Sequence, residues 1–96
     1  MKTIYIAGPI TNIPNYKANL DKAEQFLKSK GWTVVNPSIL PEGFKQEQYM
    51  KVCFEMLDWC DTVYFLSGWA KSKGSCQEFE YADARKMNMI FEVTNE

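Results

Sequence analysis

Four short runs of β-branched and aromatic residues recur along the chain, and each is closed by glycine, proline or polar residues. The first run is stopped abruptly by Gly8-Pro9. Runs of this length and composition, bounded by turn-forming residues, predict β-strands. The predicted strands cover residues 3–7, 32–35, 61–66 and 89–93.

Between these runs, apolar residues recur every three or four positions. Tyr16, Leu20, Ala23 and Leu27 are separated by polar residues, which predicts an amphipathic helix. Gly31 is expected to end this helix as the glycine just beyond its last turn. Two further helices are predicted, one over residues 46–59 and one over residues 75–87.

Strands and helices therefore alternate in the order β-α-β-α-β-α-β over one unit, residues 1–96. Strands joined by single helices form right-handed crossovers and a parallel sheet. We predict an α/β fold, a single Rossmann-like or flavodoxin-like domain whose four-stranded parallel sheet has helices on both faces. Ligands bind such sheets beyond the carboxyl ends of the strands. This rule selects the loops at residues 8–15, 36–44 and 67–75.

The charge balance excludes several classes of function. The chain has eleven lysines and arginines, twelve aspartates and glutamates, and a formal net charge of −1, and its one arginine is Arg85. A nucleic-acid groove needs a basic excess and arginine contacts, so no nucleic-acid partner is expected. The chain has no histidine, which excludes histidine-based acid–base catalysis and histidine-ligated zinc.

The cysteines and the apolar segments indicate a cytoplasmic protein. Cys53, Cys60 and Cys76 form no C-x-x-C pair, and we interpret them as reduced, small apolar side chains. No segment approaches the roughly 18 apolar residues that span a bilayer, and the opening apolar run is short for a signal peptide. We therefore expect no membrane partner and no metal site.

The loop before the third predicted helix has the composition of an anion site. It reads Ser-Gly-Trp-Ala-Lys-Ser-Lys-Gly-Ser over residues 67–75. Free backbone N–H groups and the positive end of the helix dipole suit an anion at such a position. The pattern G-x-x-x-x-G-K-[ST] is absent, so the loop is not a P-loop.

Three carboxylates stand near predicted element ends, and each has more than one interpretation. Glu78, in the first turn of the third helix, is either a base or nucleophile, or the last member of a capping box that begins at Ser75. Asp61 suits a turn before the third strand, whereas Asp58 is unfavourable to the helix end that it occupies. Tyr5, in the first strand, suits core packing.

Three tryptophans are many for a domain of this size. Trp32, Trp59 and Trp69 are more typical of a core or a subunit interface than of cofactor stacking. We expect at least one of them in an interface. The expected assembly is a homodimer or larger homo-oligomer, formed through the second helix and neighbouring aromatic residues.

Short motifs spread over nearly the whole chain resemble the nucleoside 2-deoxyribosyltransferase superfamily, and most closely its small phage and bacterial branch, DUF4406. The most specific motif is G-x-x-x-E-x-x-x-A after a hydrophobic strand, at Gly74, Glu78 and Ala82. The other motifs are Tyr5-Ile6-Ala7-Gly8-Pro9, Val34-Val35-Asn36-Pro37, Asp61 before Val63-Tyr64-Phe65-Leu66, and Gly68-Trp69.

In that superfamily the glutamate is the nucleophile that attacks the anomeric carbon of a 2′-deoxyribosyl N-glycoside. The resemblance therefore implies that Glu78 is the nucleophile and that Tyr5 orients it. Superfamily enzymes that act on 5′-monophosphates have serine two residues before the glycine, whereas those that act on free nucleosides have aspartate. Ser72, with Lys71 and Lys73 on either side, therefore indicates a 5′-phosphate.

Two parts of the chain depart from the superfamily pattern, the first loop and the C-terminal residues. Pro9, Ile10 and Thr11 stand where the monophosphate enzymes have serine and arginine, so the phosphate grip is expected to be weaker or built differently. Asn95 is a loose counterpart of the asparagine that some transferases lend to a neighbouring active site.

The implied function is cleavage or exchange of the N-glycosidic bond of a 2′-deoxynucleoside or its 5′-monophosphate, with Asp58 or Asp61 facing the base and helping to protonate it. The alternative is a non-catalytic module that keeps the pocket and sequesters a nucleotide. The partner is a small nucleoside or nucleotide, and no metal or redox cofactor is implied. The implied substrate-binding residues are Gly8, Pro9, Ile10, Asn36, Gly68, Trp69, Ser72, Lys73, Gly74 and Ser75.

Overall fold

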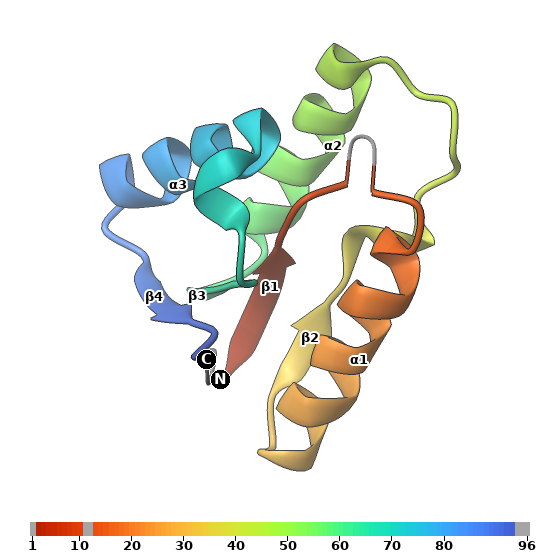
Figure 1. Ribbon diagram of the computed structural model, residues 1–96. Coiled ribbons are helices and arrows are strands. Elements are labelled where there is room, and N and C mark those ends of the chain that lie inside the picture. The colour runs from red at the N-terminus through yellow and green to blue at the C-terminus, as the bar shows by residue number, and fades with distance from the viewer. Residues whose placement is uncertain (1, 11–12, 94–96) are drawn as a thin grey trace.

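Strands and helices alternate along the chain in the predicted order. The computed structural model describes residues 2–10 and 13–93 (Figure 1). Its elements are β1 (Thr3–Ala7), α1 (Tyr16–Ser29), β2 (Thr33–Val35), α2 (Gln46–Asp58), β3 (Thr62–Phe65), α3 (Lys73–Ala84) and β4 (Asn88–Phe91), with 3₁₀ turns at Pro37–Ile39 and Trp69–Lys71.

The four strands form one parallel sheet in the order β2-β1-β3-β4. β1 is central, and Tyr5 is paired with Val35 on one side and with Val63 on the other. The chain moves outward in one direction from β1 to β2 and in the other from β3 to β4, so the strand order switches between β1 and β3. A crevice is expected at this switch point, at the carboxyl ends of the strands.

Both faces of the central strands are covered, which explains why β1 and β3 are apolar without alternation. Tyr5, Ala7, Val63 and Phe65 pack toward α2 and α3 in one core cluster. The residues that alternate with them, Ile4, Ile6, Tyr64 and Leu66, form a second cluster with α1. Figure 1 shows this arrangement, with α1 on one side of the sheet and α2 and α3 on the other. The predicted α/β domain, with a four-stranded parallel sheet and helices on both faces, is confirmed.

One predicted helix end is confirmed and two are corrected. Gly31 has φ +91° and follows α1, as predicted for the glycine beyond a helix end. α3 begins at Lys73, two residues before the predicted start at Ser75, because the hydroxyl of Ser72 caps it by accepting the Ser75 N–H at 3.3 Å. It ends at Ala84 rather than at residue 87.

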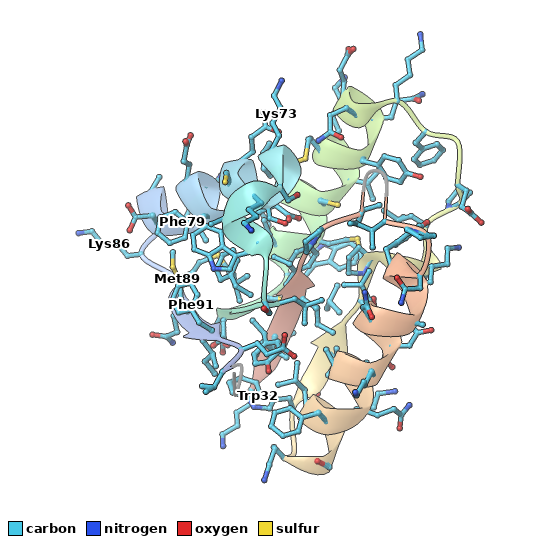
Figure 2. All side chains as sticks on the ribbon, viewed as in Figure 1. Trp32, Lys73, Phe79, Lys86, Met89 and Phe91 are labelled. Carbon is cyan, nitrogen blue, oxygen red and sulfur yellow. The ribbon has the colours of Figure 1, made fainter. Side chains whose placement is uncertain are left out.

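The tryptophans have three different environments. Trp69 stacks on Phe79, with ring centroids 5.0 Å apart, and also contacts Phe65 and Phe91. Figure 2 shows Phe79 of α3 beside Phe91 of β4, and Trp32 at the opposite end of the molecule from Lys73. Trp59 is 60% exposed at the end of α2. The expected homo-oligomer stays a prediction.

The cysteines Cys53, Cys60 and Cys76 are free thiols. None of the helices in the described part of the chain has the length and apolar character that crossing a bilayer requires. Over the same residues, no three cysteine, aspartate or glutamate side chains gather as a metal site would need.

Candidate functional site

A small pocket of about 30 Å³ lies at the carboxyl end of β1, where the strand order switches. Its walls come from the loop after β1, from one face of α2 and from the first two turns of α3. Glu78 of α3 lines this pocket. The lining residues are Gly8, Ile10, Gln46, Tyr49, Met50, Cys53, Ser72, Gly74, Ser75 and Glu78.

The carboxyl of Glu78 is bound by the phenol of Tyr5. The Tyr5 hydroxyl donates a hydrogen bond to Glu78 Oε2 with an O···O distance of 2.5 Å. Tyr5 is 0% exposed in the middle of β1, and Glu78 is 5% exposed in α3. The central strand therefore carries the hydrogen-bond partner of the Glu78 carboxyl, whereas the roles of this pair as orienting phenol and nucleophile stay a prediction.

Burial decides the protonation of both groups. It raises the pKa of Glu78 from 4.5 to about 7, although hydrogen bonds from Tyr5 and Cys53 act in the opposite direction. Burial, followed by the charge of Glu78, raises the pKa of Tyr5 well above 10. Tyr5 therefore stays protonated and donates a hydrogen bond, whereas Glu78 exists as both carboxyl and carboxylate near neutral pH.

The capping-box interpretation of Glu78 is wrong. The cap of α3 is Ser72, and the Ser75 N–H donates to the Ser72 hydroxyl rather than to Glu78. With Tyr5 as its partner, Glu78 contributes nothing to the helix end. Ser75 is 1% exposed, and its own Oγ has no hydrogen-bond partner among the described residues although it lines the Glu78 pocket. A buried hydroxyl of this kind is available to a polar ligand or a water.

Two glycines allow this close packing. A Cβ on Gly8 would come within 2.6 Å of Leu66 Cδ1, so any side chain at this position would force the buried Leu66 side chain to move. A Cβ on Gly74 would lie 3.1 Å from Gln46 Nε2 and 3.6 Å from Met50 Sδ. Gly74 therefore lets the start of α3 lie directly against α2 at the mouth of the pocket.

A wider cleft of about 1220 Å³ adjoins the Glu78 pocket and shares Gln46, Ser72 and Gly74 with it. Lys73 lines the cleft and projects outward from the start of α3 (Figure 2). Its other basic lining residues are Lys22 and Lys71. The cleft therefore places positive charge beside the amino end of α3, where backbone N–H groups lack helical partners.

The predicted substrate-binding residues divide between the pocket and the cleft, with two exceptions. Gly8, Ile10, Ser72, Gly74 and Ser75 line the pocket, whereas Pro9, Gly68 and Lys73 line the cleft. Thr11 and Asn95 lie outside the described residues.

The two exceptions are Asn36 and Trp69, which have structural contacts. The Asn36 amide donates to Asp21 at 3.0 Å and to Glu24 at 2.8 Å, and its carbonyl oxygen accepts the Ser38 N–H. Its polar atoms are therefore used to join the end of β2 to α1. Trp69 packs in the aromatic cluster with Phe79 and does not line the pocket.

Asp58 and Asp61 are not at this site, which corrects the prediction that either faces the base. Asp61 lies at the amino ends of the strands, where its N–H donates to the Thr3 carbonyl and its carbonyl accepts the Asn88 N–H. Asp58 accepts the Tyr81 hydroxyl at 2.8 Å and pairs with Arg85 Nε at 3.1 Å. Both carboxylates are therefore on the edge of the sheet opposite Glu78.

Sequence reasoning missed the contribution of α2. Gln46, Tyr49, Met50 and Cys53 line the pocket from positions i, i+3, i+4 and i+7 of that helix. The sequence predicted the helix over residues 46–59, but we placed none of these four residues in the site. The first half of α2 extends beyond the carboxyl edge of the sheet, so that part of its inner face lines the pocket.

The family model described as "Domain of unknown function (DUF4406)" matches residues 2–91 of the chain. Among solved structures, the chain is similar to a protein described as "2-desoxiribosyltransferase from Leishmania mexicana", with a TM-score of 0.74 and 23% sequence identity. The match covers 99% of this chain and 66% of that protein, so this chain spans less than two thirds of its length. The likeness shows a shared flavodoxin-like fold. No curated protein matches the chain.

From the burial of Glu78 we predict how the free energy of unfolding depends on pH. Its pKa of about 7 in the folded protein exceeds the unfolded value of 4.5, so the folded state binds more protons between these pH values. The free energy of unfolding should therefore fall as pH rises from 4.5 to 7. Glu78→Gln mimics the protonated form and should stabilise the protein at pH 8, by on the order of 3 kcal/mol.

Denaturant unfolding of both proteins at pH 4 and pH 8 measures this difference, which should vanish at pH 4. Glu80→Gln, an exposed carboxyl on the same helix, is the matched control and should change little at either pH. A Glu78→Gln protein less stable than wild type at pH 8 would show instead that the carboxylate has a structural role.

Proposed function

The chain belongs to the DUF4406 family, and we propose that it cleaves or exchanges the N-glycosidic bond of a 2′-deoxynucleoside or its 5′-monophosphate. The observation that carries this proposal is the buried Glu78 carboxyl, bound to Tyr5 and lining a pocket at the carboxyl edge of the sheet. The fold shared with a protein described as a 2-desoxiribosyltransferase supports the same reaction class.

The alternative is a non-catalytic module that sequesters a nucleotide. Such a module gains nothing from a buried carboxyl, because ionising that group costs stability and its charge repels a phosphate. A nucleophile gains from the same features, since a desolvated carboxylate that is positioned by a phenol is ready to attack a carbon. The cost of burying Glu78 therefore favours the enzyme.

In the first step a Glu78 carboxylate oxygen attacks C1′ of the deoxyribose. A C1′–O bond forms as the C1′–N bond breaks, and the bonding electron pair leaves with the base. The transition state is oxocarbenium-like, and the product is a glycosyl ester of Glu78. Tyr5 holds one oxygen of the Glu78 carboxyl, which lines the pocket.

In the second step an oxygen of water, or a nitrogen of a second base, attacks C1′ from the opposite side and gives its proton to solvent water. The ester C1′–O bond breaks and Glu78 leaves as a carboxylate. Two displacements at one carbon give retention of configuration. Since Asp58 and Asp61 are at the far edge of the sheet, the departing base takes its proton from water in the open cleft.

The wider cleft and the start of α3 suit the rest of the substrate. C1′ of the sugar would face Glu78 across the small pocket, and the cleft beside it has room for the remaining groups. A 5′-phosphate would lie at the amino end of α3, near the Ser72 hydroxyl, the first N–H groups of the helix and Lys73. Ser75 Oγ, which has no protein partner, would donate to the sugar.

Turnover should depend on Glu78 as an ionised group. Glu78→Gln should lower product formation by a factor on the order of a thousand or more, because an amide cannot form the ester intermediate. For wild type, kcat/KM should rise with pH through a midpoint near 7 and level off about one pH unit above that midpoint, since only the carboxylate attacks. Chromatography of products from a panel of deoxynucleosides and deoxynucleotides measures both.

Glu80→Gln should retain full turnover and the wild-type pH profile. A Glu78→Gln protein with most of the wild-type activity would overturn the mechanism. A wild-type protein that binds a deoxynucleotide without forming product over the whole panel would support the sequestering module instead.

Phosphate preference should depend on Ser72. A deoxynucleoside 5′-monophosphate should bind wild type at least tenfold more tightly than the matched nucleoside, a difference of about 1.4 kcal/mol. Ser72→Asp should erase or invert that preference by placing a carboxylate against the phosphate. Aspartate is as good a helix cap as serine, so α3 should remain folded.

The matched control is Ser72→Asn, because asparagine also caps helices but carries no charge. It should keep a preference for the monophosphate. Titration calorimetry gives the affinities of all three proteins for the monophosphate and the nucleoside, and circular dichroism checks their helix content. Equal affinities of wild type for the two ligands, or tighter binding of the nucleoside, would mean that Ser72 is only a cap.

A further inference from the structure

The wider cleft extends well beyond the part that adjoins the Glu78 pocket. One of its ends is at the start of α3. The other end lies on the face of the sheet that carries Tyr64 of β3 and Ile90 of β4, beside Phe26 of α1. The cleft volume of about 1220 Å³ exceeds the roughly 300–1,000 Å³ of a pocket for a drug-sized ligand, a class that includes mononucleotides. A mononucleotide placed at Glu78 would therefore use only part of the cleft.

The far end of the cleft is apolar and partly open to solvent. Of the described helices, α1 is the one on this side of the sheet, and it packs mainly against β1 and β2, whereas β4 is at the opposite edge (Figure 1). Ile90 is paired with Tyr64, so both side chains are on this face. Ile90 is 38% exposed and Phe26 is 50% exposed, and the ring centroids of Phe26 and Tyr64 are 6.4 Å apart. A half-exposed aromatic ring beside an apolar floor suits a flat aromatic group that stacks on it.

The charges around the cleft suit an anion with more than one phosphate. Among the described residues that line it, Glu92 is the acidic one, and the basic ones are Lys22, Lys71 and Lys73. One oxygen of the Glu92 carboxylate already accepts a backbone N–H at 2.8 Å. Lys73 is at the start of α3, whereas Lys22 is on α1, one helical turn before Phe26. A 5′-phosphate at the start of α3 would pair with Lys73 and leave Lys22 for a second phosphate nearer the apolar end.

We propose that the substrate is a dinucleotide, a 2′-deoxynucleoside 5′-diphosphate whose terminal phosphate carries a second nucleoside. This inference rests on the proposed function and narrows its substrate class. The reacting sugar faces Glu78, the first phosphate lies at the start of α3, the second phosphate pairs with Lys22, and the second base stacks on Phe26. The C1′–N bond that breaks is the one described above, and the second nucleoside stays attached to the sugar that is transferred to Glu78.

A second copy of the chain suits the same surface less well. In a two-fold symmetric interface the same surface patch of both copies meets. The lysines of one cleft would then face the lysines of the other, and like charges brought together at an interface repel each other. Glu92, the acidic residue among the described lining residues, is already hydrogen-bonded and does not balance them. The charge of the cleft therefore favours an anionic ligand.

A matched pair of ligands tests the proposal. One is a deoxynucleoside 5′-monophosphate, and the other is the dinucleotide in which a pyrophosphate joins two copies of the same deoxynucleoside through their 5′ oxygens. The two ligands carry similar charge at about pH 8, so a difference in affinity reports the second nucleoside. The dinucleotide should bind at least tenfold more tightly. Titration calorimetry with the Glu78→Gln protein measures both affinities, because this variant should leave the ligands intact.

Two substitutions in the same background locate the second nucleoside. Phe26→Ala should weaken binding of the dinucleotide at least tenfold, and Lys22→Gln about fivefold, whereas binding of the monophosphate should change less than twofold in both. Trp59→Ala and Lys51→Gln are the matched controls, since both side chains are exposed and line neither the pocket nor the cleft. They should leave both affinities unchanged. All four substitutions are at exposed positions, so the variants should fold.

Equal affinities for the two ligands, or a loss on Phe26→Ala that is the same for both, would overturn the proposal. A dimer in sedimentation velocity that Phe26→Ala dissociates, without any gain for the dinucleotide, would also overturn it, because a second copy would then cover the cleft. Phe26-dependent binding of the dinucleotide with no base released by wild type would support the binding site and contradict the proposed function alone. Release of base from the monophosphate with no preference for the dinucleotide would contradict this inference alone.

Discussion

The hydrogen bond from the Tyr5 phenol to the Glu78 carboxyl joins the central strand to the third helix at the point where the pocket begins. Both side chains are buried, so neither has water as an alternative partner. In that surrounding the bond fixes which carboxylate oxygen is occupied, while burial keeps the phenol protonated and raises the pKa of Glu78. The orientation of the Glu78 carboxyl at the pocket depends on this contact, which also ties α3 to the central strand.

The polar groups at the amino ends of the strands differ in role from those at the carboxyl ends. At the amino ends of the strands, Asp61 closes backbone contacts with β1 and β4, and Asp58 joins α2 to Tyr81 and Arg85 of the third helix region. These polar groups are paired with one another. At the carboxyl ends, Glu78 is ionised at a cost in stability and Ser75 Oγ is unpaired. Polar groups left unpaired or charged at such a cost are typical of functional sites.

Much of the fold follows from the sequence, because the apolar runs and helical spacings are strong local signals. The carboxyl-edge rule also selected the loops at Gly8 and Ser72, which line the pocket, and the loop at residues 36–44, which lines neither the pocket nor the cleft. Other features could not be predicted, because the sequence supports two alternatives equally well. Ser72 and Ser75 are both good caps, and the sequence does not show which of them begins α3. Whether the apolar face of α2 covers core or pocket depends on how far the helix extends beyond the sheet.

The most direct test of the account is to trap the covalent intermediate. The 2′-fluorine of a fluorinated deoxynucleoside 5′-monophosphate analogue destabilises the oxocarbenium-like transition states. It therefore slows both formation and breakdown of the glycosyl ester, and the ester should accumulate. Intact-protein mass spectrometry should show a gain equal to one fluorinated sugar phosphate. Peptide mapping should place that gain on Glu78, and Glu78→Gln should show none. Release of free base from the analogue with no mass gain on the protein, or with the gain on another residue, would contradict the account.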